Sequence, residues 1–96
     1  MSQKFEWDAL KAASNFAKHR IRFETAIRIF ADPFLYTQQD RIENGEWRWQ
    51  SIGMLHGHCV ILVAHTVTEG AGAEVIRIIS ARKAEPKERK RYEQQH

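Results

Sequence analysis

The spacing of apolar residues in the first third of the chain is helical. Residues 9–19 follow Asp8, whose carboxylate is suited to accept hydrogen bonds from the first free amides of a helix, so they predict a first helix with Asp8 as its N-cap. A second helix is predicted over residues 23–31 by four apolar side chains at i, i+3, i+4 and i+7, namely Phe23, Ala26, Ile27 and Phe30. The pair Asp32-Pro33 ends it, because proline disfavours helical backbone at the residue before it.

The first predicted helix has two stripes of opposite character. An apolar stripe is expected to be buried and consists of Leu10, Ala13 and Ala17, with Phe16 beside them. A polar stripe at i, i+4 and i+8 consists of Lys11, Asn15 and His19, with Lys18 beside it. The polar stripe places three side chains with binding or proton-transfer chemistry on one face.

Beyond Pro33 the pattern changes from a helical to an alternating period. Strands are predicted over residues 35–38, 47–52, 59–67 and 75–81, with a turn at 55–58 and a hairpin loop at 69–74. A last helix is predicted to begin at Pro86 and to run through Tyr92. The expected fold class is α+β, with two N-terminal helices, a four-stranded antiparallel sheet and a C-terminal helix, the helices packed on one face of the sheet.

Length and composition fit a single domain over residues 1–96. The chain is 43% hydrophobic and 28% charged, which is the balance of a globular protein rather than a disordered one. The single cysteine, Cys59, excludes an internal disulfide and fits a reducing compartment. Residues 1–15 contain no apolar region typical of a signal peptide, and the apolar run at 59–64 is too short to span a membrane. A cytoplasmic location is therefore expected.

Charge is distributed unevenly along the chain. Residues 75–96 contain seven Lys/Arg and three Glu, a net charge of +4, whereas residues 1–74 contain eight Lys/Arg and nine Asp/Glu, a net charge of −1. The whole basic excess of the chain therefore lies near its C-terminus. This asymmetry indicates a polyanionic partner.

Two arginines are expected to project from strands. Arg48 lies between two tryptophans and Arg77 between two isoleucines, and the rigid guanidinium fork suits recognition of a phosphate. The alternative is a solvated sheet face in which arginine stems cover tryptophan rings. Strict alternation puts Arg77 and Arg82 on opposite faces, so a joint site requires the strand to end or to bulge near Ser80 or Ala81.

The other reactive side chains give weaker signals. His19 has a side chain suited to general acid–base work, but a histidine at the end of a helix also interacts favourably with the helix dipole without any chemistry. His56 and His58 form a pair in a turn with no obvious third ligand, so no metal or other cofactor is expected. Cys59 lies in an apolar strand and is interpreted as a core residue rather than a nucleophile.

These residues leave two function classes open. Cleavage of RNA needs no outside nucleophile, because the ribose 2′-hydroxyl lies next to the scissile phosphate. The protein must supply a base, an acid and cations for the charge that develops on the phosphate, and histidine, arginine, lysine and tyrosine can fill these roles. The alternative is a non-catalytic module that binds nucleic acid or protein through its basic C-terminal helix.

Several segments occur in an order that is specific as a set: "FEWD" at 5–8, "FETAIRIFADP" at 23–33, "GEWRW" at 45–49 and "RIISARKAEPKERKRYE" at 77–93. Through them the chain resembles the BrnT family of type II toxin–antitoxin toxins over nearly its full length. The resemblance implies a RelE-like ribonuclease fold, RNA cleavage that stops translation, and a BrnA-like antitoxin with a ribbon-helix-helix domain. Operator DNA would be bound only through the antitoxin complex, and the assembly would be a homodimer or a 2:2 toxin–antitoxin complex.

The resemblance also implies where the site lies. The family's recurrent polar positions fall on Lys11, Asn15, Lys18, His19, Glu24, Glu46, Arg48, Arg77, Arg82 and Tyr92. The predicted catalytic residues are His19 for proton transfer and Arg48, Arg77 and Arg82 for holding and stabilising the phosphate. The residues predicted to bind RNA are Lys11, Lys18, Arg89 and Tyr92.

Overall fold

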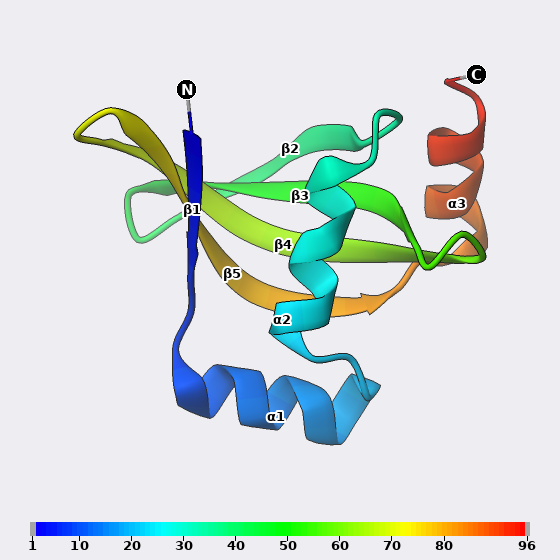
Figure 1. The fold of residues 1–96 in the computed structure, drawn as a ribbon, viewed down its shortest axis with the longest axis horizontal. Coiled ribbons are helices and arrows are strands. Elements are labelled where there is room, and N and C mark those ends of the chain that lie inside the picture. Colours follow the sequence, from blue (N-terminus) through cyan, green and yellow to red (C-terminus); the bar gives the residue numbers. More distant parts are fainter. Residues whose placement is uncertain (1, 96) are drawn as a thin grey trace.

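The computed structural model describes residues 2–95 as one five-stranded sheet with helices against it (Figure 1). In chain order the elements are β1 (Ser2–Glu6), α1 (Ala9–His19), α2 (Phe23–Ala26), the 3-10 helix η1 (Ile27–Ala31), β2 (Tyr36–Glu43), β3 (Glu46–Leu55), β4 (Cys59–Gly70), β5 (Ala73–Lys83) and α3 (Pro86–Glu93). The predicted α+β class is confirmed, and each predicted strand and helix has a counterpart among these elements.

The sheet has one more strand than predicted, and it is mixed rather than antiparallel. Its strand order is β1-β5-β4-β3-β2, and β1 pairs with β5 in parallel, from Ser2 opposite Ala73 to Glu6 opposite Arg77. The prediction of four antiparallel strands was therefore wrong. The N-terminal segment has no alternating apolar pattern and only Phe5 is half-buried, so it forms a strand because β5 offers it an edge.

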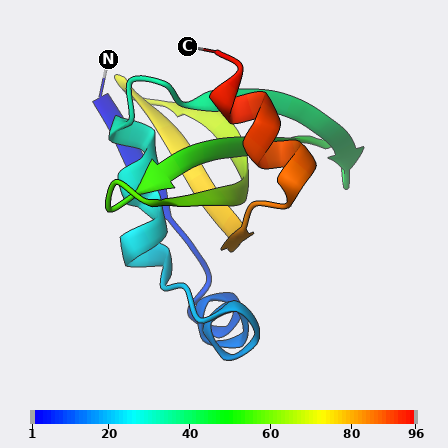
Figure 2. The ribbon, with the colours of Figure 1, turned by 90° about the vertical axis from the view of Figure 1, so that its right-hand side faces the viewer.

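The helices lie on both faces of the sheet, not on one as predicted (Figure 2). The face against α2 and η1 holds the larger core cluster, which comprises Phe23, Ala26, Ile29, Leu55, Ile61, Val63, Ile76, Ile78 and Ala81. The opposite face holds a smaller cluster, in which Tyr92 of α3 packs with Ile52, Val60 and Leu62. The physical reason lies in β4, whose apolar side chains point to both faces and need cover on each.

The orientation of α1 also differs from the prediction. Leu10 is 82% exposed, and Ala13 and Ala17 are exposed as well, so the apolar stripe faces solvent. The helix is fixed instead by the buried Asn15, whose Oδ1 accepts from the Ala81 amide at 3.0 Å and whose Nδ2 donates to the Ala81 carbonyl at 3.0 Å. The pairing between β1 and β5 ends at Arg77, so the backbone of β5 beyond it needs another partner, and this one side chain satisfies both backbone groups of Ala81.

Candidate functional site

The polar stripe of α1 lies along the second half of β5. Asp8 caps the helix as predicted, and its carboxylate accepts from the amides of Leu10 at 2.7 Å and Lys11 at 3.3 Å. With Asn15 bound to Ala81, the same side of the helix presents Lys11 and His19 beside β5. The predicted shared face of these side chains is therefore confirmed.

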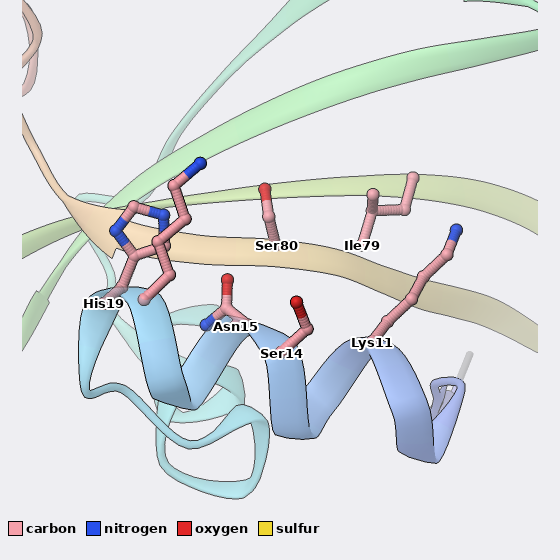
Figure 3. Close-up of a pocket in the computed structure, with 7 residues that line it drawn as sticks. Lys11, Ser14, Asn15, His19, Ile79 and Ser80 are labelled. Atoms are coloured by element: carbon pink, nitrogen blue, oxygen red, sulfur yellow. The ribbon is translucent and has the colours of Figure 1, made fainter.

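A first cavity lies between α1 and β5 and is called the histidine cavity. It has a volume of ≈ 200 Å³ and is lined by Lys11, Ser14, Asn15, Lys18, His19, Ile79 and Ser80. Figure 3 shows the α1 side chains and Ser80 of β5 around one space, with the His19 ring at one end and Lys11 at the other. The cavity thus combines an imidazole, hydroxyl groups and two ammonium groups.

A second cavity adjoins the first and is called the arginine cavity. It has a volume of ≈ 240 Å³ and is lined by Asp8, Lys11, Asn44, Glu46, Arg48, Arg77, Ile78 and Ile79. Lys11 and Ile79 line both cavities, so the two adjoin along β5. Three cations, Lys11, Arg48 and Arg77, therefore line the second cavity.

Carboxylates from the β2–β3 hairpin orient both arginines of this cavity. Arg77 donates to Glu46 at 2.6 Å, and the Nη2 atom of Arg48 lies 3.1 Å from a carboxylate oxygen of Glu43. The Arg48 side chain is only 12% exposed, and its Nε is buried without an acceptor among the described residues. Buried donors are normally hydrogen-bonded, so this N–H is an exception within residues 2–95.

A bulge in β5 puts its functional side chains on one face. Ala64 pairs with Ser80 and His65 with Ile78, so Ile79 has no partner of its own on β4. Without the extra residue, Arg77 and Arg82 would face opposite sides of the sheet; with it, both face the side covered by α3. The bulge lies next to Ser80, where the sequence required one.

Although Arg82 shares this face, it lines neither cavity. It lies about 14 Å from Arg77 along the strand, because their partners Leu62 and Thr66 on β4 are four residues apart. Its two terminal nitrogens donate to the carboxylate of Glu88 at 2.8 and 3.0 Å. The hydrogen bonds that Arg82 donates to Glu88 lower the pKa of the Glu88 carboxyl and raise the pKa of the Arg82 guanidinium.

The Arg82–Glu88 pair anchors the start of α3. The same Glu88 oxygen accepts from the backbone amide of Glu85 at 2.8 Å, which completes a capping box at the helix N-terminus. One carboxylate therefore caps the helix and ties it to the end of β5. The structure thus gives Arg82 a structural partner rather than a place beside Arg77.

The two remaining predicted RNA-binding residues lie on α3, away from both cavities. Tyr92 is 3% exposed, and its hydroxyl donates to Asp32 at 2.5 Å. Burial, together with this hydrogen bond, raises the pKa of Tyr92 to about 12. Arg89 is exposed on the helix surface. Tyr92 therefore serves the core between α3 and the sheet, and Arg89 remains accessible to a partner.

Two polar residues of the arginine cavity, Asp8 and Asn44, were absent from the predicted site, and Glu46 was among the family's recurrent positions without a predicted role. Glu46 lies on the face of Arg48 because it is two positions earlier on the same strand, so alternation alone could have identified it. Asn44 lies in the β2–β3 turn with a φ of 53°, and Asp8 reaches the cavity from the start of α1. No local pattern connects these last two with Arg77, because the fold brings them together.

The other candidate residues lie elsewhere. His56 and His58 lie in the turn before β4, and within residues 2–95 no group of three His, Cys, Asp or Glu is arranged to hold a metal ion. Cys59 is half-buried and packs against the larger core cluster, as its interpretation as a core residue predicts. In the part of the chain that the structure describes, no helix has the length and apolar character needed to cross a membrane.

Comparisons with known proteins agree with this arrangement. The crystal structure of the Brucella abortus ribonuclease toxin BrnT superposes with a TM-score of 0.60 at 24% sequence identity, over 88% of this chain and 99% of that one. This likeness shows a shared fold. No curated protein sequence matches the chain significantly.

Residues 7–88 match the family described as the ribonuclease toxin, BrnT, of type II toxin–antitoxin systems. The matched segment includes His19 and all three arginines of the predicted site, whereas β1, Arg89 and Tyr92 lie outside it. The match covers most of the 96 residues, and the chain belongs to the BrnT family of ribonuclease toxins.

Proposed function

We propose that this chain is the toxin of a type II toxin–antitoxin system, a RelE-like, metal-independent endoribonuclease that arrests translation by cleaving RNA. The observation that supports it most is the convergence of Lys11, Arg48 and Arg77 on one cavity, where the buried Nε of Arg48 has no acceptor among the described residues. The adjoining cavity supplies an imidazole, His19. Cations beside a proton-transfer group are what phosphodiester cleavage requires of a protein.

In the proposed reaction, the cations of the arginine cavity hold the scissile phosphate. The 2′-hydroxyl gives up its proton as its oxygen attacks phosphorus, and the 5′-oxygen takes up a proton as its bond to phosphorus breaks. The products are a 2′,3′-cyclic phosphate and a free 5′-hydroxyl. Negative charge builds up on the phosphate oxygens during this step. Arg48 and Arg77 face that charge with donors already oriented by Glu43 and Glu46, so little reorganisation is needed.

His19 is the proposed proton-transfer residue. Lys11 lines both cavities, so a phosphate held by the arginines lies next to the space that contains the imidazole. Lys18 lines the same space and would contact a neighbouring phosphate, and Arg89 would do so from α3. Arg82 would act on the substrate only if a phosphate replaced Glu88 on its guanidinium.

The proposed partner is a BrnA-like antitoxin with a ribbon-helix-helix domain. In this proposal the antitoxin neutralises the toxin and contacts operator DNA, which the toxin reaches only through the complex. The assembly is proposed to be a complex of two toxins with two antitoxins. The alternative assembly is a homodimer of the toxin alone. Size-exclusion chromatography with light scattering distinguishes the two.

The purified chain is expected to degrade RNA in the presence of EDTA and to leave DNA intact, since DNA lacks the attacking 2′-hydroxyl. His19→Ala and Arg48→Ala are expected to lower the cleavage rate about 100-fold or more. Arg28→Ala is the matched control, because Arg28 is exposed and lines neither cavity. Activity lost in EDTA and restored by a divalent cation would contradict the metal-independent mechanism.

The alternative function is a non-catalytic module that binds nucleic acid or protein through α3. The observation in its favour is that Lys87, Arg89 and Lys90 are exposed on α3, away from both cavities. It predicts that RNA is bound but not cut, and that His19→Ala changes nothing. The same RNA assay therefore separates the two functions.

A further inference from the structure

A third cavity lies between α1 and the start of α2, outside the proposed site. It has a volume of ≈ 310 Å³ and is called the interhelix groove; its lining residues are Ala12, Ala13, Phe16, Arg22, Phe23 and Glu24. Four of the six are apolar, and two of these are aromatic. None of these residues lines the histidine cavity or the arginine cavity.

The apolar surface of the groove continues around α1. Ala13 forms one wall, and Leu10, one helical turn earlier on the same side, is 82% exposed. A single exposed leucine is ordinary, but Leu10 extends the groove into a contiguous apolar surface, and such surfaces mark sites that pack against a partner. Groove and leucine together form an apolar surface that no described part of this chain covers.

The charges around the groove are mainly positive. The guanidinium groups of Arg20 and Arg22 lie 5.6 and 4.6 Å from the centre of the Phe16 ring, and both side chains are exposed. Glu24 is the one acidic residue that lines the groove. An apolar floor with cations at its edge is complementary to an amphipathic helix whose apolar stripe is bordered by Asp and Glu.

We propose that the interhelix groove and Leu10 form the docking site for an acidic amphipathic helix of the antitoxin. This proposal rests on the proposed neutralisation by a protein antitoxin. A second apolar surface exists at the β2–β3 hairpin, where Ile42 is 56% and Trp47 is 48% exposed. That surface lines none of the three cavities, and charges of both signs, Arg41 and Glu43, lie beside it, so it lacks a comparable match to an acidic helix.

The position of the groove explains how such a partner would inhibit the toxin. One side of α1 lines the groove and another side lines the histidine cavity. The groove and the cavity are therefore separated by one helix diameter, ~10 Å. Acidic side chains bound at the groove would lie slightly more than one Debye length from the histidine cavity, since that length is about 8 Å at physiological salt. They would oppose the binding of RNA there even without covering the site, and more strongly at low salt.

The test measures binding of the full-length chain to the product of the adjacent antitoxin gene by titration calorimetry. Leu10→Glu and Ala13→Glu are expected to weaken the complex about 10- to 100-fold, because each puts a carboxylate on an apolar surface that is proposed to contact an acidic partner. Arg22→Glu is expected to weaken it as well and to reduce its dependence on salt. Ile42→Glu, on the hairpin, is the matched control and is expected to bind like the wild type.

Wild-type affinity in both α1 variants would overturn the proposal. Loss of binding in Ile42→Glu alone would also overturn it, because that result would place the antitoxin on the hairpin. The thermal midpoint of each free variant reports folding. The free variants are expected to keep cleaving RNA, because none of the substituted residues lines the histidine or arginine cavity and one added carboxylate repels RNA much less than a bound acidic helix. If the wild type binds the antitoxin, Leu10→Glu does not, and neither cleaves RNA, then the ribonuclease proposal fails while the docking site stands. If both cleave RNA and both bind equally, the docking proposal alone fails.

Discussion

Arg77 and Arg82 leave the same strand on the same face, but their carboxylate partners give them different roles. Glu46 binds Arg77 across the sheet at 2.6 Å and itself lines the arginine cavity, so this pair fixes a guanidinium group at the cavity wall. Glu88 binds Arg82 with both oxygens and also caps α3. Two arginines that look equivalent in the sequence therefore differ because one contacts the site and the other contacts a helix terminus.

The difference predicts opposite outcomes for two alanine substitutions. Arg77→Ala is expected to lower the rate of RNA cleavage about 100- to 1000-fold, with the thermal midpoint nearly unchanged. Arg82→Ala is expected to lower the free energy of unfolding by about 1–2 kcal/mol. The expected loss is smaller than for a fully buried ion pair, because Arg82 is 30% exposed and solvent screens its interaction with Glu88. Cleavage kinetics and thermal unfolding of both variants check this.

Two conservative substitutions serve as controls for this pair. Arg77→Lys retains the charge but loses the two-pronged donor geometry, so its activity should stay well below that of the wild type. Glu88→Gln should reproduce the stability loss of Arg82→Ala. An Arg82→Ala variant with normal stability and no activity would show instead that Arg82 acts in catalysis.

At the scale of elements, a chain of polar side chains, buried at Ser51 and His65, connects β2, β3 and β4. The hydroxyls of Thr37 on β2 and Ser51 on β3 lie 2.9 Å apart, and the Ser51 hydroxyl lies 2.7 Å from Nε2 of His65 on β4. Phe30 of η1 packs edge-on against the imidazole. Ser51 is fully buried, so this serine–histidine pair is closed to a substrate and its role is structural.

The burial of His65 predicts a loss of stability in acid. Burial lowers the pKa of His65 from 6.5 to about 4, with a hydrogen bond to the Thr66 carbonyl acting in the opposite direction. Between these values the unfolded chain binds a proton that the native state does not. The contribution of neutral His65 to the free energy of unfolding is therefore fully present above pH 6.5. It falls by up to roughly 3 kcal/mol as the pH drops to about 4.

Urea unfolding at several pH values from 7.5 to 4 measures this effect, and His65→Gln is expected to flatten the dependence. Glu88 does not obscure it. The pKa of Glu88 is lowered in the native state, so the stability that the ionised carboxylate contributes is lost only below the ordinary glutamate pKa of 4.5. An equally steep fall in His65→Gln would assign the acid sensitivity to other groups.

Local signals predicted the elements well, and tertiary contacts decided the rest. Asp8 and Pro86 marked helix starts that the structure confirms, because capping and proline effects act within one turn. The strand at 2–6 has no such signal and depends on an edge of β5 some seventy positions away. The exposure of the apolar stripe of α1 likewise follows from Asn15, whose partner Ala81 is 66 residues away.

The candidate site could be predicted only in part for the same reason. Its arginines and His19 were identifiable as residue types on the right elements. Their division between two adjoining cavities, and the attachment of Arg82 to α3, depend on how α1 and α3 pack against β5. The sequence indicated that a joint site requires β5 to end or to bulge near Ser80 or Ala81, and the pairing of β4 with β5 places a bulge next to Ser80, at Ile79.

At the scale of the whole molecule, the basic C-terminal segment flanks the face of the sheet that holds the arginines. Tyr92 packs α3 onto the same face of the sheet toward which Arg77 and Arg82 point, opposite α2 (Figure 2). Not all cations of this segment are available to a polyanion. Arg82 is paired with Glu88 and Arg91 donates to Gln38 at 2.9 Å, whereas Lys87, Arg89 and Lys90 are exposed on α3.

These three exposed cations are expected to set much of the salt dependence of RNA binding. Each phosphate that they neutralise releases counterions, so replacing all three with Gln should reduce the slope of log Kd against log salt by up to about 2. The matched control replaces Lys4, Arg20 and Arg28, which are exposed and line none of the three cavities, and so changes the net charge equally. Fluorescence anisotropy with a short RNA at several salt concentrations measures both slopes. If the two triple variants shift the slope equally, only the net charge matters. An unchanged slope in the α3 variant would mean that this helix is a solvated surface and that the cations of the two cavities bind the RNA without it.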